Sequence, residues 1–148
     1  MEEKLHYDVQ LIFAIMSGRV SAALNKKLSR NFTAYNVALT PDQWMVLLHL
    51  WRQDGVSQQE LCRVTSRDKP AITRLIDGRE EQGLVQRWPS ARDRRVNLVH
   101  LTDKARELEG KARFVGYKTL KEALRGLSQE ELKTAQNVLR RVFSNSKD

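Results

Sequence analysis

The chain has 148 residues, a formal net charge of +8 and 41% hydrophobic residues, which fits one compact protomer with its own core. No apolar run approaches the roughly 18 residues of a membrane span, and the N-terminus is too polar for a signal peptide. We therefore expect a cytoplasmic protein with no membrane partner. A single cysteine and three scattered histidines exclude an internal disulfide and give no metal-ligand spacing, so we expect neither metal nor cofactor.

Arginine dominates the basic residues of the middle third of the chain. Within residues 63–95 every basic residue except Lys69 is an arginine. The planar guanidinium matches phosphate groups and guanine edges better than the ammonium of lysine does. A basic surface that only keeps the protein soluble is the simpler interpretation, so charge alone leaves the partner open.

Apolar residues recur every three or four positions between residues 3 and 30, which predicts one long amphipathic helix. The stripe consists of Leu5, Val9, Ile12, Phe13, Met16, Val20, Ala23, Leu24 and Leu28. Gly18 weakens this helix only modestly. The stripe needs a cover, either the protein's own core or a second subunit. Residues 31–39 lack a clean period and are expected to form a connection.

Capping residues predict the next two helices. Thr40-Pro41-Asp42-Gln43 combines an N-cap, a proline in the first turn and a glutamine that can bond back to the cap. This helix is expected to end at Asp54-Gly55. Ser57 and Glu60 form a second capping box, which opens a short helix to Val64.

A further helix is predicted after the turn at residues 65–67, with Asp68 as its cap. Its apolar residues Ile72, Leu75 and Ile76 fall on one face and are expected to point inward. The opposite face carries Lys69, Pro70, Thr73, Arg74 and Asp77. Such a face near a helix N-terminus suits contact with the major groove of DNA. An ordinary solvated helix face is the alternative.

A basic hairpin follows. Gly83 can close the preceding helix in a left-handed conformation, and residues 84–88 and 95–101 are expected to be paired strands around a polar tip. Three arginines lie near the tip: Arg92, Arg94 and Arg95. Arginines inserted into a narrow minor groove are attracted by its concentrated negative potential. Helix, turn, helix and hairpin in this order describe a winged helix-turn-helix.

Two helices are predicted after the hairpin. Thr102-Asp103 begins a long one, in which Gly110 and Gly116 make continuity less certain. A break at Gly126-Leu127 precedes a last helix, which begins with Ser128 and Glu131 as a third capping box. Its apolar stripe consists of Leu132, Ala135, Val138, Leu139, Val142 and Phe143.

Taken in order, five motifs resemble those of the MarR family of transcriptional regulators. They are L-T-P-D-Q-W-x-V-L-x-x-L (39–50), S-Q-Q-E-L (57–61), D-K-P-A-I-T-R-L-I-D (68–77), Q-G-L-V-Q-R (82–87) and D-R-R-x-x-x-x-x-L-T (93–102). The motifs cover about residues 39–108, and the flanking helices match by architecture. The ordered set is specific, although each motif alone is weak.

The resemblance implies a mainly α fold with a small β-hairpin wing, built as one protomer over residues 1–148. Residues 1–35 and 103–148 would form a helical dimerisation region from both termini, and residues 36–102 a winged helix-turn-helix lobe. The implied function is a homodimeric transcription regulator, a ligand-responsive repressor that binds a palindromic operator in double-stranded DNA. No nucleophile–base–acid set or phosphate loop indicates an enzyme.

The resemblance also assigns site residues. It places Lys69, Pro70, Thr73 and Arg74 in the major groove and Arg95 in the minor groove, with Asp93 supporting Arg95 and Arg94 at a phosphate. Arg92, at the tip of the hairpin, is a further candidate for DNA binding. The family often holds small aromatic or phenolic effectors between the lobe and the dimerisation region. Met16, Trp44 and His49 are our candidates for lining that pocket; core packing is the alternative for Trp44 and a structural role for His49.

Three residues depart from the family pattern. Arg79 stands where leucine is usual, Ala105 where glycine is usual, and Gly78 should weaken the turn that holds Arg79. Arg79 is expected either to extend along the lobe or to contact the DNA backbone. These departures leave open a winged-helix module for protein–protein contact with reduced DNA binding. A redox-sensing regulator that uses Cys62 is a further alternative to a structural cysteine.

Overall fold

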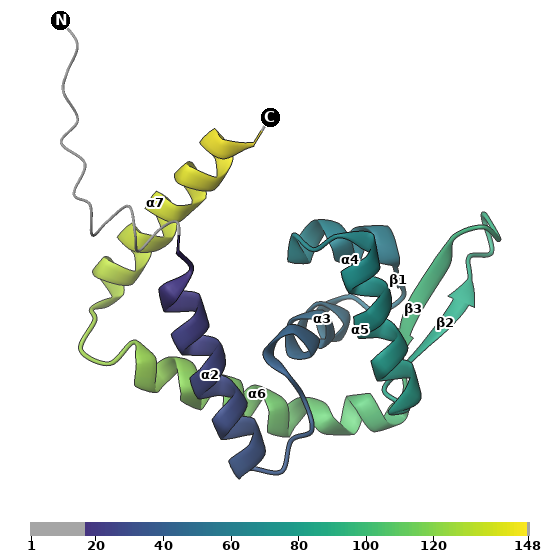
Figure 1. The fold of residues 1–148 in the computed structure, drawn as a ribbon, viewed down its shortest axis with the longest axis horizontal. Helices are drawn as coiled ribbons and strands as arrows, with labels where there is room; N and C mark the ends of the chain where they lie inside the picture. Colours follow the sequence, from purple (N-terminus) through teal and green to yellow (C-terminus); the bar gives the residue numbers. More distant parts are fainter. Residues whose placement is uncertain (1–16, 148) are drawn as a thin grey trace, which may run out of the picture.

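The computed structural model describes residues 17–147, and its shape is an open U (Figure 1). The long helix α6 forms the base, α2 and α7 lie at one end, and a compact lobe with a projecting hairpin lies at the other. The elements are α2 (Arg19–Ala34), α3 (Pro41–Arg52), β1 (Val56–Ser57), α4 (Gln58–Thr65), α5 (Lys69–Glu81), β2 (Val85–Pro89), β3 (Asn97–Leu101), α6 (Asp103–Ala123) and α7 (Gln129–Ser146). Within the described part of the chain, no helix combines the length and apolarity of a membrane span.

The predicted caps are confirmed at five helix starts. In each case a side-chain oxygen accepts a hydrogen bond from the backbone N–H three residues later, which satisfies a donor that the helix itself leaves free. The capping residues are Thr40, Ser57, Asp68, Thr102 and Ser128. Of these five, the Thr40 cap is fully reciprocal, because the Gln43 side chain accepts the Thr40 N–H at 2.8 Å.

The prediction of one uninterrupted helix over residues 3–30 is wrong at its centre, and residues 3–16 lie outside the described residues. Gly18 has φ +65°, a left-handed conformation that an α-helix cannot contain, so α2 begins after it. The helix then runs four residues past the predicted end. Phe32, which we assigned to a connection, is buried on its inner face.

The hairpin is confirmed, and the sheet has one more strand than expected. β2 pairs antiparallel with β3 from Val85↔Leu101 to Pro89↔Asn97, and the two-residue β1 pairs with the other edge of β3. Gly55 makes this possible by turning the chain with φ +70°. A Cβ at Gly55 would lie 2.8 Å from the His100 ring, so this position admits no side chain.

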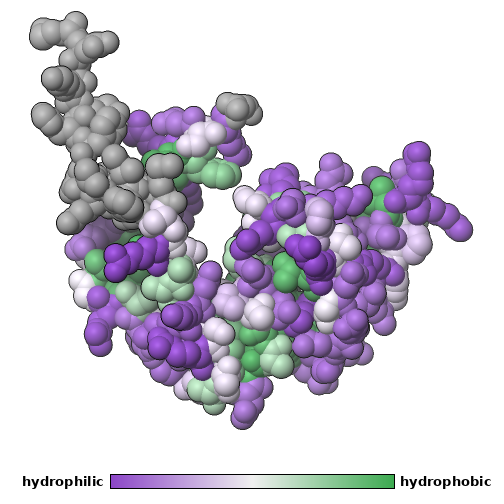
Figure 2. Space-filling view, in the orientation of Figure 1, coloured by the Kyte–Doolittle hydropathy of each residue, from purple (hydrophilic) through white to green (hydrophobic). Residues whose placement is uncertain are grey.

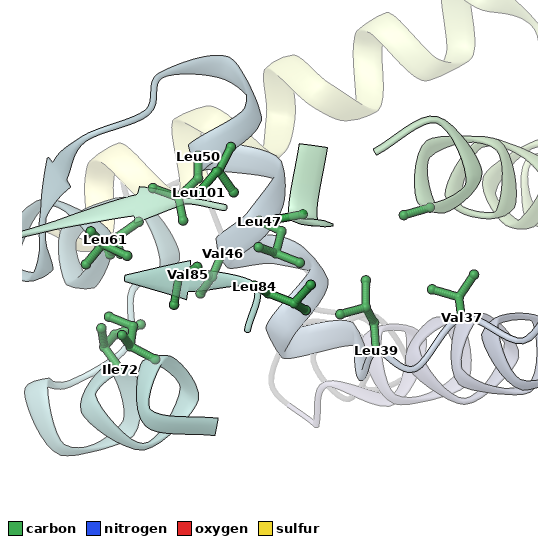
Figure 3. Close-up of a cluster of buried hydrophobic side chains, with 14 of the residues drawn as sticks. Val37, Leu39, Val46, Leu47, Leu50, Leu61, Ile72, Leu84, Val85 and Leu101 are labelled. Carbon is green, nitrogen blue, oxygen red and sulfur yellow. The ribbon is translucent and has the colours of Figure 1, made fainter. Parts of the chain in front are cut away.

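Apolar side chains from α3, α4, α5 and the sheet form the core of the lobe (Figure 3). Ile72 and Ile76 are fully buried, as their helical spacing predicted. Leu47, Leu50 and Leu61 close the core from α3 and α4. Because these residues fix which face of α5 points inward, they also fix which face points out to solvent.

Hydrogen bonds attach the lobe to the start of α6. Asp54, at the end of α3, accepts the Leu101 N–H at 2.8 Å and pairs with Arg106 at 2.8 Å. The indole N–H of Trp51 donates to the Ala105 carbonyl at 3.1 Å. The lobe and the first turns of α6 are therefore joined by polar contacts as well as by the sheet.

Helix α6 is continuous through both of its interior glycines, Gly110 and Gly116, and close packing explains why one of these positions is a glycine. Gly116 lies against Trp44 of α3, whose ring also contacts Phe32 edge-on at 6.0 Å. A Cβ on Gly116 would lie 2.4 Å from the Trp44 ring. Gly110 faces open space. Gly116 therefore allows α3 and α6 to approach closely, whereas Gly110 does not serve this purpose.

Arg79 is buried on the inner face of α5, with 4% of its surface exposed. Its Nε and Nη1 atoms have no hydrogen-bond partner among the described residues, and burial lowers the pKa of the guanidinium. The expectation of a contact with the DNA backbone is wrong, because Arg79 lies on the same side as Ile72 and Ile76. Gly78 does not interrupt the helix, which continues to Glu81.

We expect Gly116→Ala to lower the free energy of unfolding by about 1–3 kcal/mol, because the new methyl group overlaps the Trp44 ring. Gly110→Ala is the matched control in the same helix. It should raise stability by roughly 0.5–1 kcal/mol, because alanine has the better helix propensity and meets no neighbour. Urea unfolding of both variants measures the difference, and equal effects would contradict the packing role of Gly116.

We expect Arg79→Leu to stabilise the protein by about 1–3 kcal/mol, because it replaces a buried, unpartnered cation with an apolar side chain. Arg74→Leu, on the exposed side of the same helix, should change stability by no more than about 0.5 kcal/mol. Thermal and denaturant unfolding give both values. A lower stability for Arg79→Leu would show that the guanidinium makes contacts worth more than its desolvation.

Candidate nucleic-acid interface

The outward face of α5 presents the helix residues that were predicted to contact DNA. Lys69, Pro70 and Arg74 are exposed and Thr73 is half-buried. They are brought together because positions three and four apart share a helix face, while Ile72 faces the core. The Asp68 cap accepts the Ala71 N–H at 2.8 Å, which fixes the first turn and with it the positions of Lys69 and Pro70.

The tip of the wing presents arginines in the turn between β2 and β3, where Arg92, Arg94 and Arg95 are all exposed. The side chain of Arg95 is 91% exposed, yet it is oriented by Asp93. Asp93 Oδ1 accepts from the Arg95 backbone N–H at 3.0 Å and from its Nε at 3.1 Å. These bonds lower the pKa of the Asp93 carboxyl, so it is ionised at neutral pH.

A hollow of about 630 Å³ separates the helix from the wing. Its walls come from α4, the start of α5 and the wing: Ser57, Gln58, Gln59, Cys62, Arg67, Asp68, Lys69, Arg95, Val96 and Asn97. Lys69 and Arg95 therefore line one concave surface from opposite sides. A concavity bordered by cations on a protein of net charge +8 attracts a polyanion.

Arg87 and Gln58 are residues of this region whose role the sequence did not predict. The Arg87 side chain, only 16% exposed, bonds to Asp77 Oδ1 at 2.6 Å, Glu80 Oε1 at 3.2 Å and the Thr73 carbonyl at 3.3 Å. The alternation of the strand could have indicated this role for Arg87. Arg87 is two residues after buried Val85, so both side chains lie on the same face of the strand, toward α5. These bonds fasten the wing to the helix.

Gln58 completes the connection between Arg87 and the DNA-facing side of α5. The Arg87 Nε donates to Gln58 Oε1 at 2.8 Å, and Gln58 Nε2 donates to the Thr73 hydroxyl at 3.3 Å. Gln58 comes from the first turn of α4, so three elements meet at this point. One hydrogen-bonded chain therefore runs from the wing strand to a residue that we assigned to the major groove.

Of the three residues assigned to an effector pocket, the structure describes Trp44 and His49, and the hollow that His49 lines does not include Trp44. Met16 lies outside the described residues. Trp44 packs against Phe32 and Gly116, on the side of α2 and α6. His49 lines a different hollow, of about 500 Å³, whose walls are Met45, Leu48, His49, Arg52, Gln53, Val64 and Thr65.

Cys62 is half-buried and packs against the lobe core, with its other side at the hollow between helix and wing. This position agrees with a structural cysteine. Among residues 17–147 no group of three or more histidine, cysteine or acidic side chains has the arrangement of a metal site.

Comparison with known proteins gives the family. A family model described as the MarR family matches residues 39–96. The solved structure of the transcriptional regulator PA3341 is 33% identical, with a TM-score of 0.76 over 90% of this chain and 96% of that chain. A MarR-family transcriptional regulator from Rhodococcus sp. RHA1 shares the fold at 20% identity, with a TM-score of 0.79 over 93% and 96% of the two chains.

Wild-type MarR from E. coli, in its apo form, has the same fold. It is 24% identical and superimposes with a TM-score of 0.71 over 93% of this chain and 98% of that chain. The motifs, the three-stranded winged lobe and these similarities agree. The chain belongs to the MarR family of DNA-binding, winged helix-turn-helix transcriptional regulators.

Proposed function

We propose that this protein is a homodimeric repressor that binds a palindromic operator in double-stranded DNA and releases it in response to a small effector. The observation that carries the proposal is the hollow bordered by Lys69 of α5 and Arg95 of the wing. Its two sides present a helix face and an oriented arginine at the same concave surface. In this proposal α5 enters the major groove and the wing enters the adjacent minor groove.

The exposed side of α5 supplies donors for base edges. Arg74 can donate two bonds to guanine O6 and N7, and Lys69 can reach either guanine or a phosphate. Pro70 occupies the first turn of the helix, where its missing N–H removes no helical bond. The compact ring of Pro70 allows the N-terminus of α5 to approach the floor of the major groove.

The wing supplies the minor-groove contact. Asp93 holds the Arg95 guanidinium in a defined direction although that side chain is almost fully solvated. Orientation before binding reduces the entropy lost when Arg95 enters a narrow groove. Arg92 and Arg94 are also exposed, whereas the ion pair with Asp93 belongs to Arg95, and we assign Arg92 and Arg94 to the phosphates on either side.

The apolar face of α7 supports the dimer. None of the residues of this 18-residue helix is buried, although it carries an amphipathic stripe. Val138, Leu139, Val142 and Phe143 are between 39% and 63% exposed, and Figure 2 shows hydrophobic surface on α7 beside the open side of the U. A continuous apolar helix face requires a cover, and a second copy supplies one by two-fold symmetry.

The dimer assigns a role to each part of the protomer. We propose that residues 1–35 and 103–148 form the dimerisation region and that residues 36–102 form the DNA-binding lobe. Two lobes related by a two-fold axis fit a palindrome whose half-sites are about one helical turn, roughly 34 Å, apart. Specific affinity is expected on the order of nanomolar at moderate salt.

The response to an effector is supported by an unsatisfied donor on α3. Trp44 Nε1 is buried without a hydrogen-bond partner among the described residues. Leaving a buried polar group unpaired costs about 1–3 kcal/mol, and an aromatic or phenolic acid brings both a ring and acceptor oxygens. We place its binding at the junction of α2, α3 and α6, beside Trp44.

We expect Arg95→Ala to weaken operator binding by about 1–3 kcal/mol, because a minor-groove contact is lost, with the dimer unchanged. Lys111→Ala removes the same charge from an exposed position of α6 and is the control. Fluorescence anisotropy at several salt concentrations measures both. Normal affinity for Arg95→Ala would remove the wing from the proposed interface.

Leu139→Asp should convert the dimer to a monomer, because it places a charge in the proposed apolar interface. Operator affinity should then fall at least about 100-fold, since one lobe alone must bind. Asn137→Asp adds the same charge to α7 outside the stripe and should remain dimeric. Sedimentation velocity and gel shifts give both readings; a dimeric Leu139→Asp protein would contradict the role of α7.

We expect a small aromatic acid to raise the melting temperature and to weaken operator binding, and Trp44→Phe to reduce both effects because it lacks the indole N–H. A thermal-shift screen followed by anisotropy identifies such compounds. For a repressor, the same compound should increase transcription of a reporter gene placed behind the operator. If no compound changes DNA affinity, the protein is a constitutive regulator.

A further inference from the structure

The chain of hydrogen bonds from Arg87 through Gln58 to Thr73 determines what Thr73 can recognise. We infer that Gln58 and Arg87 orient the Thr73 hydroxyl as a hydrogen-bond donor toward the DNA, so that Thr73 selects a base with an acceptor at its major-groove edge. The inference rests on the proposed function, since it requires α5 in the major groove. Gln58 and Arg87 are positioning residues, and Thr73 makes the contact.

The chemistry of Arg87 fixes the orientation of the Gln58 amide. A guanidinium only donates hydrogen bonds, so the Gln58 atom 2.8 Å from Arg87 Nε must be the carbonyl oxygen. The reversed amide would place two N–H donors against each other. Bonds to Asp77 and Glu80 hold Arg87 itself in place, so it cannot turn away to relieve such a conflict.

The oriented amide in turn fixes the role of the Thr73 oxygen. The NH₂ group of Gln58 can only donate, so Thr73 Oγ1, 3.3 Å away, must accept there. The hydroxyl proton of Thr73 therefore points away from Gln58. A hydroxyl has one proton, so the direction of that proton determines the groups to which Thr73 can donate a hydrogen bond.

Other helical threonines show what Thr73 lacks. Thr33, Thr65 and Thr119 each donate to the carbonyl four residues earlier, at 3.1, 2.6 and 2.8 Å. Such bonds consume the hydroxyl proton inside the helix. Within residues 17–147, the Thr73 hydroxyl has no acceptor for its proton. It remains available on the half-buried, DNA-facing side of α5.

The base edges of DNA differ in what they offer to such a donor. Guanine presents N7 and O6, adenine N7 and thymine O4 as major-groove acceptors, whereas cytosine presents only its amino donor. A hydroxyl whose donor direction is fixed therefore disfavours cytosine at the contacted position. Phosphate oxygens are also acceptors, but they carry no sequence information. A base contact and a phosphate contact thus predict different outcomes.

The test is selection of bound sequences from a random duplex pool with the wild-type protein and four variants. Thr73→Val removes the hydroxyl, and Thr73→Ser keeps it as the conservative control. Gln58→Glu keeps an oxygen acceptor for Arg87 but replaces the NH₂ group with a second oxygen, so that Thr73 donates to residue 58 and presents lone pairs to the DNA. Gln59→Glu adds the same charge at the neighbouring exposed position of α4.

We expect the wild type and Thr73→Ser to disfavour cytosine about five- to tenfold at one position of each half-site. Thr73→Val should lose this preference, and Gln58→Glu should shift it toward cytosine or adenine, the bases with an exocyclic amino donor. Gln59→Glu should lower affinity for all sequences without changing the preference. Melting temperatures confirm that the variants are folded.

Each other outcome overturns the inference. Unchanged preferences in Gln58→Glu, or the same change in Gln59→Glu, would show that Gln58 does not orient Thr73. A uniform loss of affinity in Thr73→Val would assign the hydroxyl to a phosphate. If the wild type selects no sequence at all, the proposed function fails first, which is distinguishable from a wild type that selects a palindrome but ignores these substitutions.

Discussion

The guanidinium of Arg87 is the contact on which the DNA-facing surface depends. It connects β2 with α4 and α5 through four hydrogen-bond partners while remaining largely shielded from solvent. Exposed ion pairs contribute little because water and salt screen them, but a shielded guanidinium with several charged and neutral acceptors is held in one geometry. The angle between wing and α5 is therefore determined by the protein before it meets DNA. Since the major and minor grooves have a fixed spacing, this angle decides whether α5 and the wing can enter neighbouring grooves together, as proposed.

The sequence predicted the parts of the fold that depend on local chemistry. Helix starts depend on a side chain and an N–H three residues away, so all five caps could be found, and the alternation of strands and apolar helix faces located the hairpin and α5. The two-residue strand β1 is too short to show a period. Its pairing with β3 depends on the turn at Gly55. The His100 ring, 45 positions later, leaves no room for a side chain at Gly55, and this contact forms only in the folded lobe.

The candidate site shows the same division. Exposed residues such as Lys69 and Arg95 could be proposed from their positions in a helix and a hairpin, and Asp93 from its place two residues before Arg95. Gln58 and Arg87 could not, because they are 29 positions apart and are joined only by the folded lobe. For Arg79, the sequence suggested a DNA contact that the structure does not support. A cation on a DNA-facing helix suggests a phosphate contact. Arg79, however, lies on the same face of α5 as Ile72 and Ile76, and this face is buried.

The attachment of the lobe to α6 also restricts how the proposed effector would act. Asp54 and Trp51 fasten the lobe to the first turns of α6, so the lobe and this end of the helix move together. In the proposed dimer, a change in the spacing of the two lobes would therefore arise farther along α6, where this helix crosses α2. There Asn31 bonds to Thr119 at 2.8 Å and Lys27 pairs with Glu122 at 3.1 Å. Trp44 packs on Gly116 at the same crossing, with its indole N–H unsatisfied. In the proposed dimer, a ligand that bonds to this N–H would act on the joint between the lobe and the proposed dimerisation region. Because both lobes of that dimer must fit the proposed operator at once, a small rotation at this joint would be enough to weaken binding.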